Sequence, residues 1–240
     1  MRIWDINPGY LNRQSLLGEH RELHGIVSII VNSKKGYSSH PETLRWVNHG
    51  WALKRRHDLL VAEMALRGYS HQSPVTTRRN KDTWPDVMID EPHRQLQILK
   101  KKYIGKEQGR IPLPENAQQL WAQHKYSVMA RDVNLYKRLG KRISAIRPGD
   151  GFLELADMLS ARLKTPPEFS GIRNALQHMW GYLPDHAVPR TGIENWTLKK
   201  LMKVIQRTVM EHGEPYLLVS TALSELDVWI ETNHIHGKAF

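Results

Sequence analysis

The stretch YLNRQSLLGEHRELHGIVSIIV, residues 10–31, decides the fold because its apolar side chains recur with helical spacing. At 100° per residue, Leu16, Leu17, Leu23 and Val27 lie on one flank of a helix, and such a flank packs against a core. Comparable periodicity recurs along most of the chain, whereas the alternation of a half-buried strand does not. The sequence therefore predicts an all-α protein.

The opposite flank of this helix carries Ser15, Gly18, Glu22 and Gly25, so small residues surround a carboxylate. A glycine inside a helix costs about 1 kcal/mol relative to alanine, and two of them suggest that something approaches the backbone closely beside Glu22. A solvated face with a local kink explains the same pattern. The pattern alone leaves both interpretations open.

The predicted helices form two groups separated by a stretch rich in Gly, Lys and Pro at residues 104–114, which we interpret as a linker. We therefore expect a first domain at 1–105 and a second helical bundle at 115–240. The first group comprises residues 10–31, 41–67 with a break near Gly50, and 92–103. The second comprises residues 115–130, 133–146, 152–163, 170–183, 195–212 and 215–232.

The chain is strongly basic, with 35 Lys and Arg against 24 Asp and Glu among 240 residues. Residues 1–112 hold 19 basic and 11 acidic side chains, net +8, against 16 and 13, net +3, in the remainder. A basic protein of this kind favours a polyanionic partner such as nucleic acid. We expect that partner to bind the first half, although a basic protein with no such role remains an alternative.

The sequence contains no cysteine, which excludes disulfides, cysteine-ligated zinc and thiol catalysis. No apolar run is long enough to span a bilayer, and the first residues lack the layout of a signal peptide. We therefore expect a cytoplasmic, monomeric protein that neither binds a membrane nor needs a cofactor.

His20 and His24 lie four residues apart, as do the zinc ligands of a metalloprotease helix. Such a helix carries its glutamate directly after the first histidine, whereas Glu22 follows by two residues and points about 200° around the helix. We therefore expect solvated or stacked histidines and no metal ion.

The N-terminal residues resemble those of the pyrimidine-dimer DNA glycosylase family, of the phage endonuclease V type. The resemblance rests on Met1-Arg2-Ile3 and on LNRQSLLGEHREL at residues 11–23, which keep the family's spacing from the chain start. Gly36-Tyr37, Glu63-Met64 and Glu91-Pro92 are similar to the bacterial branch, so the resemblance covers about residues 1–105.

This resemblance implies a DNA glycosylase with AP lyase activity, in which the N-terminal amine forms a Schiff base and β-elimination follows. An α-amine has a pKa of about 7.7–8.0 and is partly neutral at physiological pH, whereas lysine, at about 10.4, is not. By position Met1 supplies the amine, since an initiator Met is generally retained before a residue as bulky as Arg2. Glu22 matches the catalytic carboxylate, which stabilises positive charge and moves protons.

The implied partner is double-stranded damaged DNA, bound through side chains of the first domain. Arg2 and Arg21 match positions that contact phosphates beside the lesion, and a guanidinium suits that task. A further arginine of the family, four residues after Arg21, is Gly25 here. The DNA-binding residues that we expect are Arg2, Gln14, Arg21, Lys34, Lys35, Arg78 and Arg79, the last two in an exposed basic loop at residues 76–85.

The second half resembles an uncharacterised helical domain of bacteria, found fused to thiouracil-desulfidase-like proteins, through LWAQHKY at 120–126 and NALQHMWGY at 174–182. His124, Lys125, Asn174 and His178 form either a polar site or a set of packing and capping residues. Three other functions stay open: a non-catalytic DNA- or RNA-binding module, a glycosylase for another modified base, and a small-molecule or partner-binding protein.

Overall fold

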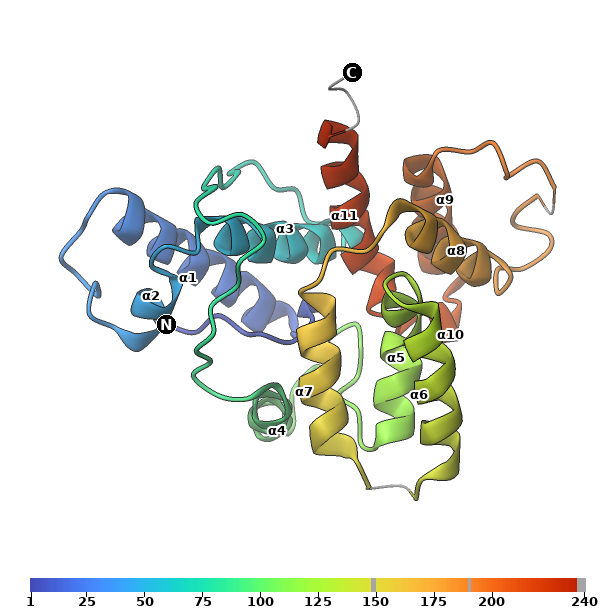
Figure 1. The fold of residues 1–240 in the computed structure, drawn as a ribbon, viewed down its shortest axis with the longest axis horizontal. Helices are drawn as coiled ribbons and strands as arrows, with labels where there is room; N and C mark the ends of the chain where they lie inside the picture. The colour runs from blue at the N-terminus through green and yellow to red at the C-terminus, as the bar shows by residue number, and fades with distance from the viewer. Residues whose placement is uncertain (148–149, 190, 237–240) are drawn as a thin grey trace. The chain divides into compact units, whose positions relative to one another are not determined.

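The computed structural model describes residues 1–147, 150–189 and 191–236, without the side chains of 231–236. Within these ranges the regular secondary structure consists of eleven α-helices and one 3-10 helix, which confirms the predicted all-α fold (Figure 1). The chain divides into two compact units, Met1–Gly109 and Arg110–Phe240. No helix in the described part of the chain is long and apolar enough to cross a membrane.

The first unit is built around two long helices that pack against each other. Its elements are η1 (Pro8–Tyr10), α1 (Arg13–Val31), α2 (Pro41–Trp46), α3 (Gly50–Leu66) and α4 (Pro92–Lys102). Helices α1 and α3 lie side by side (Figure 1). Proline occupies the first turn of both α2 and α4, where its missing N–H costs nothing.

Helix α1 begins at Arg13 rather than at residue 10, because the Asn12 side chain accepts a hydrogen bond from the Ser15 N–H and caps the helix. Leu16, Leu23 and Ile26 of this helix are fully buried, whereas Leu17 and Val27 of the predicted apolar flank are half-buried. The buried face of α1 is thus rotated slightly from the predicted one, and Glu22 lies outside this buried face.

The second unit is a bundle around α5 (Ala117–Met129), which packs against α6 (Val133–Ala145), α7 (Phe152–Leu163), α8 (Phe169–Trp180) and α11 (Ala222–His236). Helices α9 (Leu198–His212) and α10 (Pro215–Leu218) complete it. The packing at the end of α5 is close, since a Cβ built on Gly171 would lie 2.1 Å from the carbonyl oxygen of Ala130.

The helix predicted at residues 215–232 is interrupted between α10 and α11. There the Thr221 N–H donates to the Gln123 carbonyl at 2.8 Å, and the Ser127 and Thr221 hydroxyls lie 2.9 Å apart. Serine and threonine favour such local and tertiary hydrogen bonds over a continuous helix. The prediction of one helix was wrong at this point for that reason.

Candidate active site

The first residues of the chain lie in an extended segment that side chains from three helices hold in place. Ile3, Trp4 and Ile6 are buried in the core of the first unit. The N–H groups of residues 2–5 each donate to a side-chain oxygen, and the acceptors are, in order, Glu22, Glu42, Glu19 and Gln95. This ladder fixes the path of the segment up to its first residue.

Glu22 lies in the middle of α1, half-buried, and accepts its hydrogen bond from the backbone of Arg2 through Oε2. Three backbone bonds join that nitrogen to the Met1 amine, so the two nitrogens are at most about 4 Å apart. The carboxylate that the sequence singled out is therefore a close neighbour of the chain start. A carboxylate in this position can stabilise positive charge that develops beside the amine.

Glu19, one helical turn before Glu22, anchors the segment through a buried ion pair. The Arg56 guanidinium donates to both Glu19 carboxylate oxygens, at 2.7 and 2.8 Å, and to the Ile6 carbonyl at 2.7 Å. Burial raises the pKa of Glu19, while the charge and hydrogen bonds of Arg56 lower it. The pair therefore ties α3, α1 and the N-terminal segment together.

The small residues around Glu22 leave open space beside it. Gly18 and Gly25 lie four residues before and three after the carboxylate, and a Cβ built on either would meet no heavy atom within 4 Å beyond the adjacent backbone of α1 itself. Nothing in the folded chain therefore requires glycine at these positions. Close approach by a ligand from outside the chain remains as a physical reason for them.

Three of the predicted DNA-binding residues lie on this part of the unit in different settings. The Arg2 guanidinium forms an ion pair with Asp90 and lies 4.4 Å over the Trp4 ring. Arg21 is exposed and donates weakly to the Leu17 carbonyl at 3.4 Å, and Gln14 is exposed in the first turn of α1. Arg2 would have to exchange Asp90 for a phosphate in order to contact DNA.

The other four predicted DNA-binding residues surround a single cavity of about 560 Å³. Lys34 and Lys35 follow α1, whereas Arg78 and Arg79 lie in the basic loop, and all four are exposed. The loop is held on the start of α3, since the Thr77 hydroxyl donates to the Gly50 carbonyl at 2.7 Å and the Trp51 N–H to the Arg79 carbonyl at 2.9 Å. Two basic pairs far apart in the sequence thus form one positively charged concavity.

Histidines form a second feature near Glu22, because His20 and His24 meet His57 and His71. Burial, followed by the three neighbouring rings, lowers the pKa of His20 to about 4, and burial also lowers the pKa of His24 and of His71. The His20 and His24 rings meet edge to face, with 75° between their planes, and are not stacked as the sequence led us to expect. The local sequence around His57 and His71 carries no signal that would have joined them to the pair on α1.

The acceptors that position the N-terminal segment were also missed. Glu19 lies inside the stretch quoted for the resemblance, but nothing in its spacing marks it as the partner of Arg56. Glu42 and Gln95 lie on helices far from the first residues in the sequence. The only available signal for these acceptors was their polar character at helical positions that face the core.

The polar residues of the second unit are packed rather than gathered into an obvious site. His124 is buried and its ring donates to the Leu120 carbonyl at 2.9 Å, and burial lowers its pKa to about 4. The Lys125 ammonium lies 4.2 Å from the Tyr216 ring centre and 4.8 Å from that of Tyr126. His178 is exposed on α8. Cation–π contacts of this kind stabilise the bundle.

Known families match each half of the chain separately. The family model of pyrimidine dimer DNA glycosylase matches residues 1–77. A second model, of a protein of unknown function (DUF1722), matches residues 125–226. Comparisons with curated proteins and with solved structures found no match. Both resemblances expected from the sequence are thereby confirmed.

The matched range 1–77 contains the chain start, Glu22 and the lining of the basic cavity except Arg78 and Arg79, so we call residues 1–109 the glycosylase-like unit. The match supports pyrimidine dimer DNA glycosylase activity and binding to damaged DNA in this unit. The second match carries no activity with it, and residues 110–240 stay without an assigned function.

Proposed function

We propose that the glycosylase-like unit excises pyrimidine photodimers from duplex DNA with Met1 as nucleophile and Glu22 as the catalytic carboxylate. The observation that carries this proposal is the hydrogen bond from the Arg2 backbone to Glu22, which keeps the carboxylate beside the terminal amine. The match of residues 1–77 supports the glycosylase activity, and the amine mechanism is our inference from this geometry.

The proposed reaction proceeds in two stages. The neutral amine of Met1 attacks C1′ of the damaged nucleotide, the glycosidic bond breaks, and the base leaves with the bonding electrons and takes up a proton. Opening of the sugar ring then gives a Schiff base between the amine and C1′. Loss of a C2′ proton expels the 3′ phosphate by β-elimination, which is the AP lyase step. Glu22 stabilises the positive charge of the first stage and transfers protons in the second.

The space beside Glu22 and the basic cavity supply the DNA contacts in this proposal. Gly18 and Gly25 let the sugar and phosphates approach α1, and Arg21 lies exposed on the same helix. The side chains around the cavity bind phosphates farther along the duplex and add sequence-independent affinity. The target nucleotide must leave the stack to reach the amine, and a dimer site is already poorly stacked.

Borohydride trapping of the Glu22→Gln variant tests the proposal. Wild-type protein incubated with duplex DNA carrying a cyclobutane dimer should yield a covalent protein–DNA adduct after reduction. Glu22→Gln keeps the shape and loses the charge, so we expect unchanged DNA affinity and excision reduced by at least about 100-fold, the scale of one lost electrostatic stabiliser.

Glu107→Gln is the matched control, because Glu107 is an exposed carboxylate of the same unit. It should excise and trap like the wild type. Binding of damaged duplex without any adduct from the wild type would show a nucleic-acid-binding module instead of a glycosylase. If an adduct forms only with abasic DNA, the AP lyase activity would stand and the photodimer would be excluded as a substrate.

A further inference from the structure

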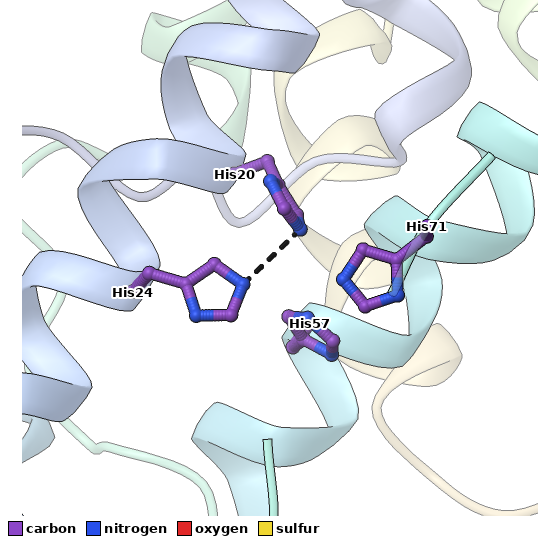
Figure 2. A group of neighbouring side chains, drawn as sticks. All are labelled: His20, His24, His57 and His71. Atoms are coloured by element: carbon purple, nitrogen blue, oxygen red, sulfur yellow. Dashed lines mark hydrogen bonds between the residues drawn. The ribbon is translucent and has the colours of Figure 1, made fainter. Parts of the chain in front are cut away.

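Four histidines of the glycosylase-like unit converge on one point (Figure 2). His20 and His24 project from α1, His57 from α3, and His71 from the segment that follows α3. One ring nitrogen of each lies within 4.8 Å of those of the other three. The six distances between ring centres run from 4.6 to 6.2 Å.

Three buried ring nitrogens of this cluster make no hydrogen bond of normal length. They are both nitrogens of His57, whose side chain is only 3% exposed, and the Nε2 of His71. An unsatisfied buried polar group costs about 1–3 kcal/mol. Helix α3 and the segment after it thus hold these nitrogens where the chain offers them only the Asp58 carboxylate, 3.7 Å from His57 Nδ1.

The spacing of the two nitrogens on α1 matches a coordination sphere. The Nε2 atoms of His20 and His24 lie 3.3 Å apart. A tetrahedral zinc ion with Zn–N bonds of about 2.0–2.1 Å separates neighbouring nitrogens by about 3.3–3.4 Å. The widest separation, 4.8 Å, exceeds this edge by about 1.5 Å, which rotations of the His57 and His71 rings can close.

The surroundings of the cluster also resemble those of metal-bound histidines. Such rings usually hydrogen-bond a carboxylate or a backbone carbonyl through their second nitrogen, which orients them. His71 has a backbone hydrogen bond to Ser73, and His57 Nδ1 lies 3.7 Å from an Asp58 carboxylate oxygen. Asp58 is itself fixed by Lys54 at 2.7 Å.

We propose that His20, His24, His57 and His71 bind one zinc ion in a closed, four-coordinate site. Imidazole ligands suit zinc, and four protein ligands without an open position are typical of structural rather than catalytic sites. This site is independent of the glycosylase proposal, since none of the four rings is assigned a part in the reaction.

The metal would join α1, α3 and the segment after α3 at a single point. Its two ligands on α1 lie two residues before and two residues after Glu22. Binding would therefore fix the rotation of α1 about its axis and hold Glu22 toward the chain start. Metal removal is expected to loosen the first unit and leave residues 110–240 unaffected.

Metal content and thermal unfolding of the full chain, purified without a histidine tag, test this proposal. Protein stripped with EDTA and dialysed against zinc should retain one zinc ion per chain, and its unfolding temperature should rise with zinc concentration. Cobalt(II) in place of zinc should give the intense visible absorption of a four-coordinate ion.

His24→Gln and His71→Gln each remove one ligand from a half-buried position, where folding tolerates the change better than at His57. Loss of a residue that only hydrogen-bonds a metal ligand weakens metal binding by up to about 100-fold, so loss of a ligand should weaken zinc binding by at least about 100-fold. Each variant should also abolish the rise in unfolding temperature with zinc. His178→Gln, on the exposed face of α8, should change neither.

Folded wild-type protein that retains no zinc would overturn the proposal, as would zinc retention that both ligand variants leave unchanged. A six-coordinate cobalt spectrum would equally refute a closed tetrahedral site. Unchanged circular dichroism of the variants distinguishes loss of the metal from loss of the fold.

Discussion

Replacing Gly18 and Gly25 by alanine is expected to stabilise the protein and to impair its action on DNA at the same time. Both glycines lie inside α1 and neither has a neighbouring atom within 4 Å of a new Cβ. Each change should therefore gain the full difference in helix propensity, about 1 kcal/mol. In a unit of 109 residues this amounts to an increase of about 4 °C in unfolding temperature for each substitution.

The same methyl groups would occupy the space through which we propose that DNA approaches Glu22. An added methyl in a close contact costs about 1–3 kcal/mol, which corresponds to a 5- to 150-fold loss in binding or excision. Thermal unfolding and excision from a dimer-containing duplex, measured on the same preparations, give both quantities. Gly140→Ala is the matched control, because Gly140 also lies inside a helix and its Cβ would make only ordinary contacts, at 3.9 Å, with Trp121.

Gly140→Ala should stabilise the protein and leave excision unchanged. Stabilised Gly18→Ala and Gly25→Ala variants with full affinity and excision would refute the close approach and leave a solvated helix face as the explanation. Variants that are not stabilised would show instead that the space beside α1 is occupied.

Three other changes test the chain start, its anchor and the basic cavity. One residue added before Met1 should abolish excision and adduct formation on dimer DNA while a C-terminal tag has no effect, and full activity would indicate an internal lysine or activated water as nucleophile. Arg56→Met should lower the free energy of unfolding by about 3–5 kcal/mol in denaturant titrations, because it leaves the buried Glu19 carboxylate without its ion-pair partner. Glu19→Gln in the same chain removes that unpaired charge and should recover part of the lost stability. Lys34→Ala and Arg79→Ala should each reduce the slope of log K against log salt by about 1, and an unchanged slope would exclude a phosphate contact.

Local signals in the sequence were sufficient for most helices. The helix predicted at residues 152–163 has those bounds in the structure, and the break predicted near Gly50 separates α2 from α3. The interruption between α10 and α11 could not be predicted in this way, because it depends on Thr221 bonding to Gln123, almost a hundred residues earlier. Tertiary hydrogen bonds of this kind produce no periodic pattern in the sequence.

The candidate site was predictable where it lies on one helix. Gly18, Glu22 and Gly25 stood out because helical spacing places them together. The histidine cluster was not predictable, since His57 and His71 reach α1 only through the packing of α3. The basic cavity was predictable in part. The sequence identified its charged residues, but only the fold shows that they surround one concavity.

The ladder at the chain start has a consequence for synthesis of the protein. The side chains that receive the N–H groups of residues 2–5 belong to positions 19, 22, 42 and 95. The opening residues of a nascent chain therefore cannot form all of these hydrogen bonds until residue 95 has emerged from the ribosome, although they are synthesised long before it. Until that moment the opening residues are open to acetyltransferases and peptidases without their native hydrogen bonds, and Gln95 of α4 supplies the last of these acceptors to be synthesised.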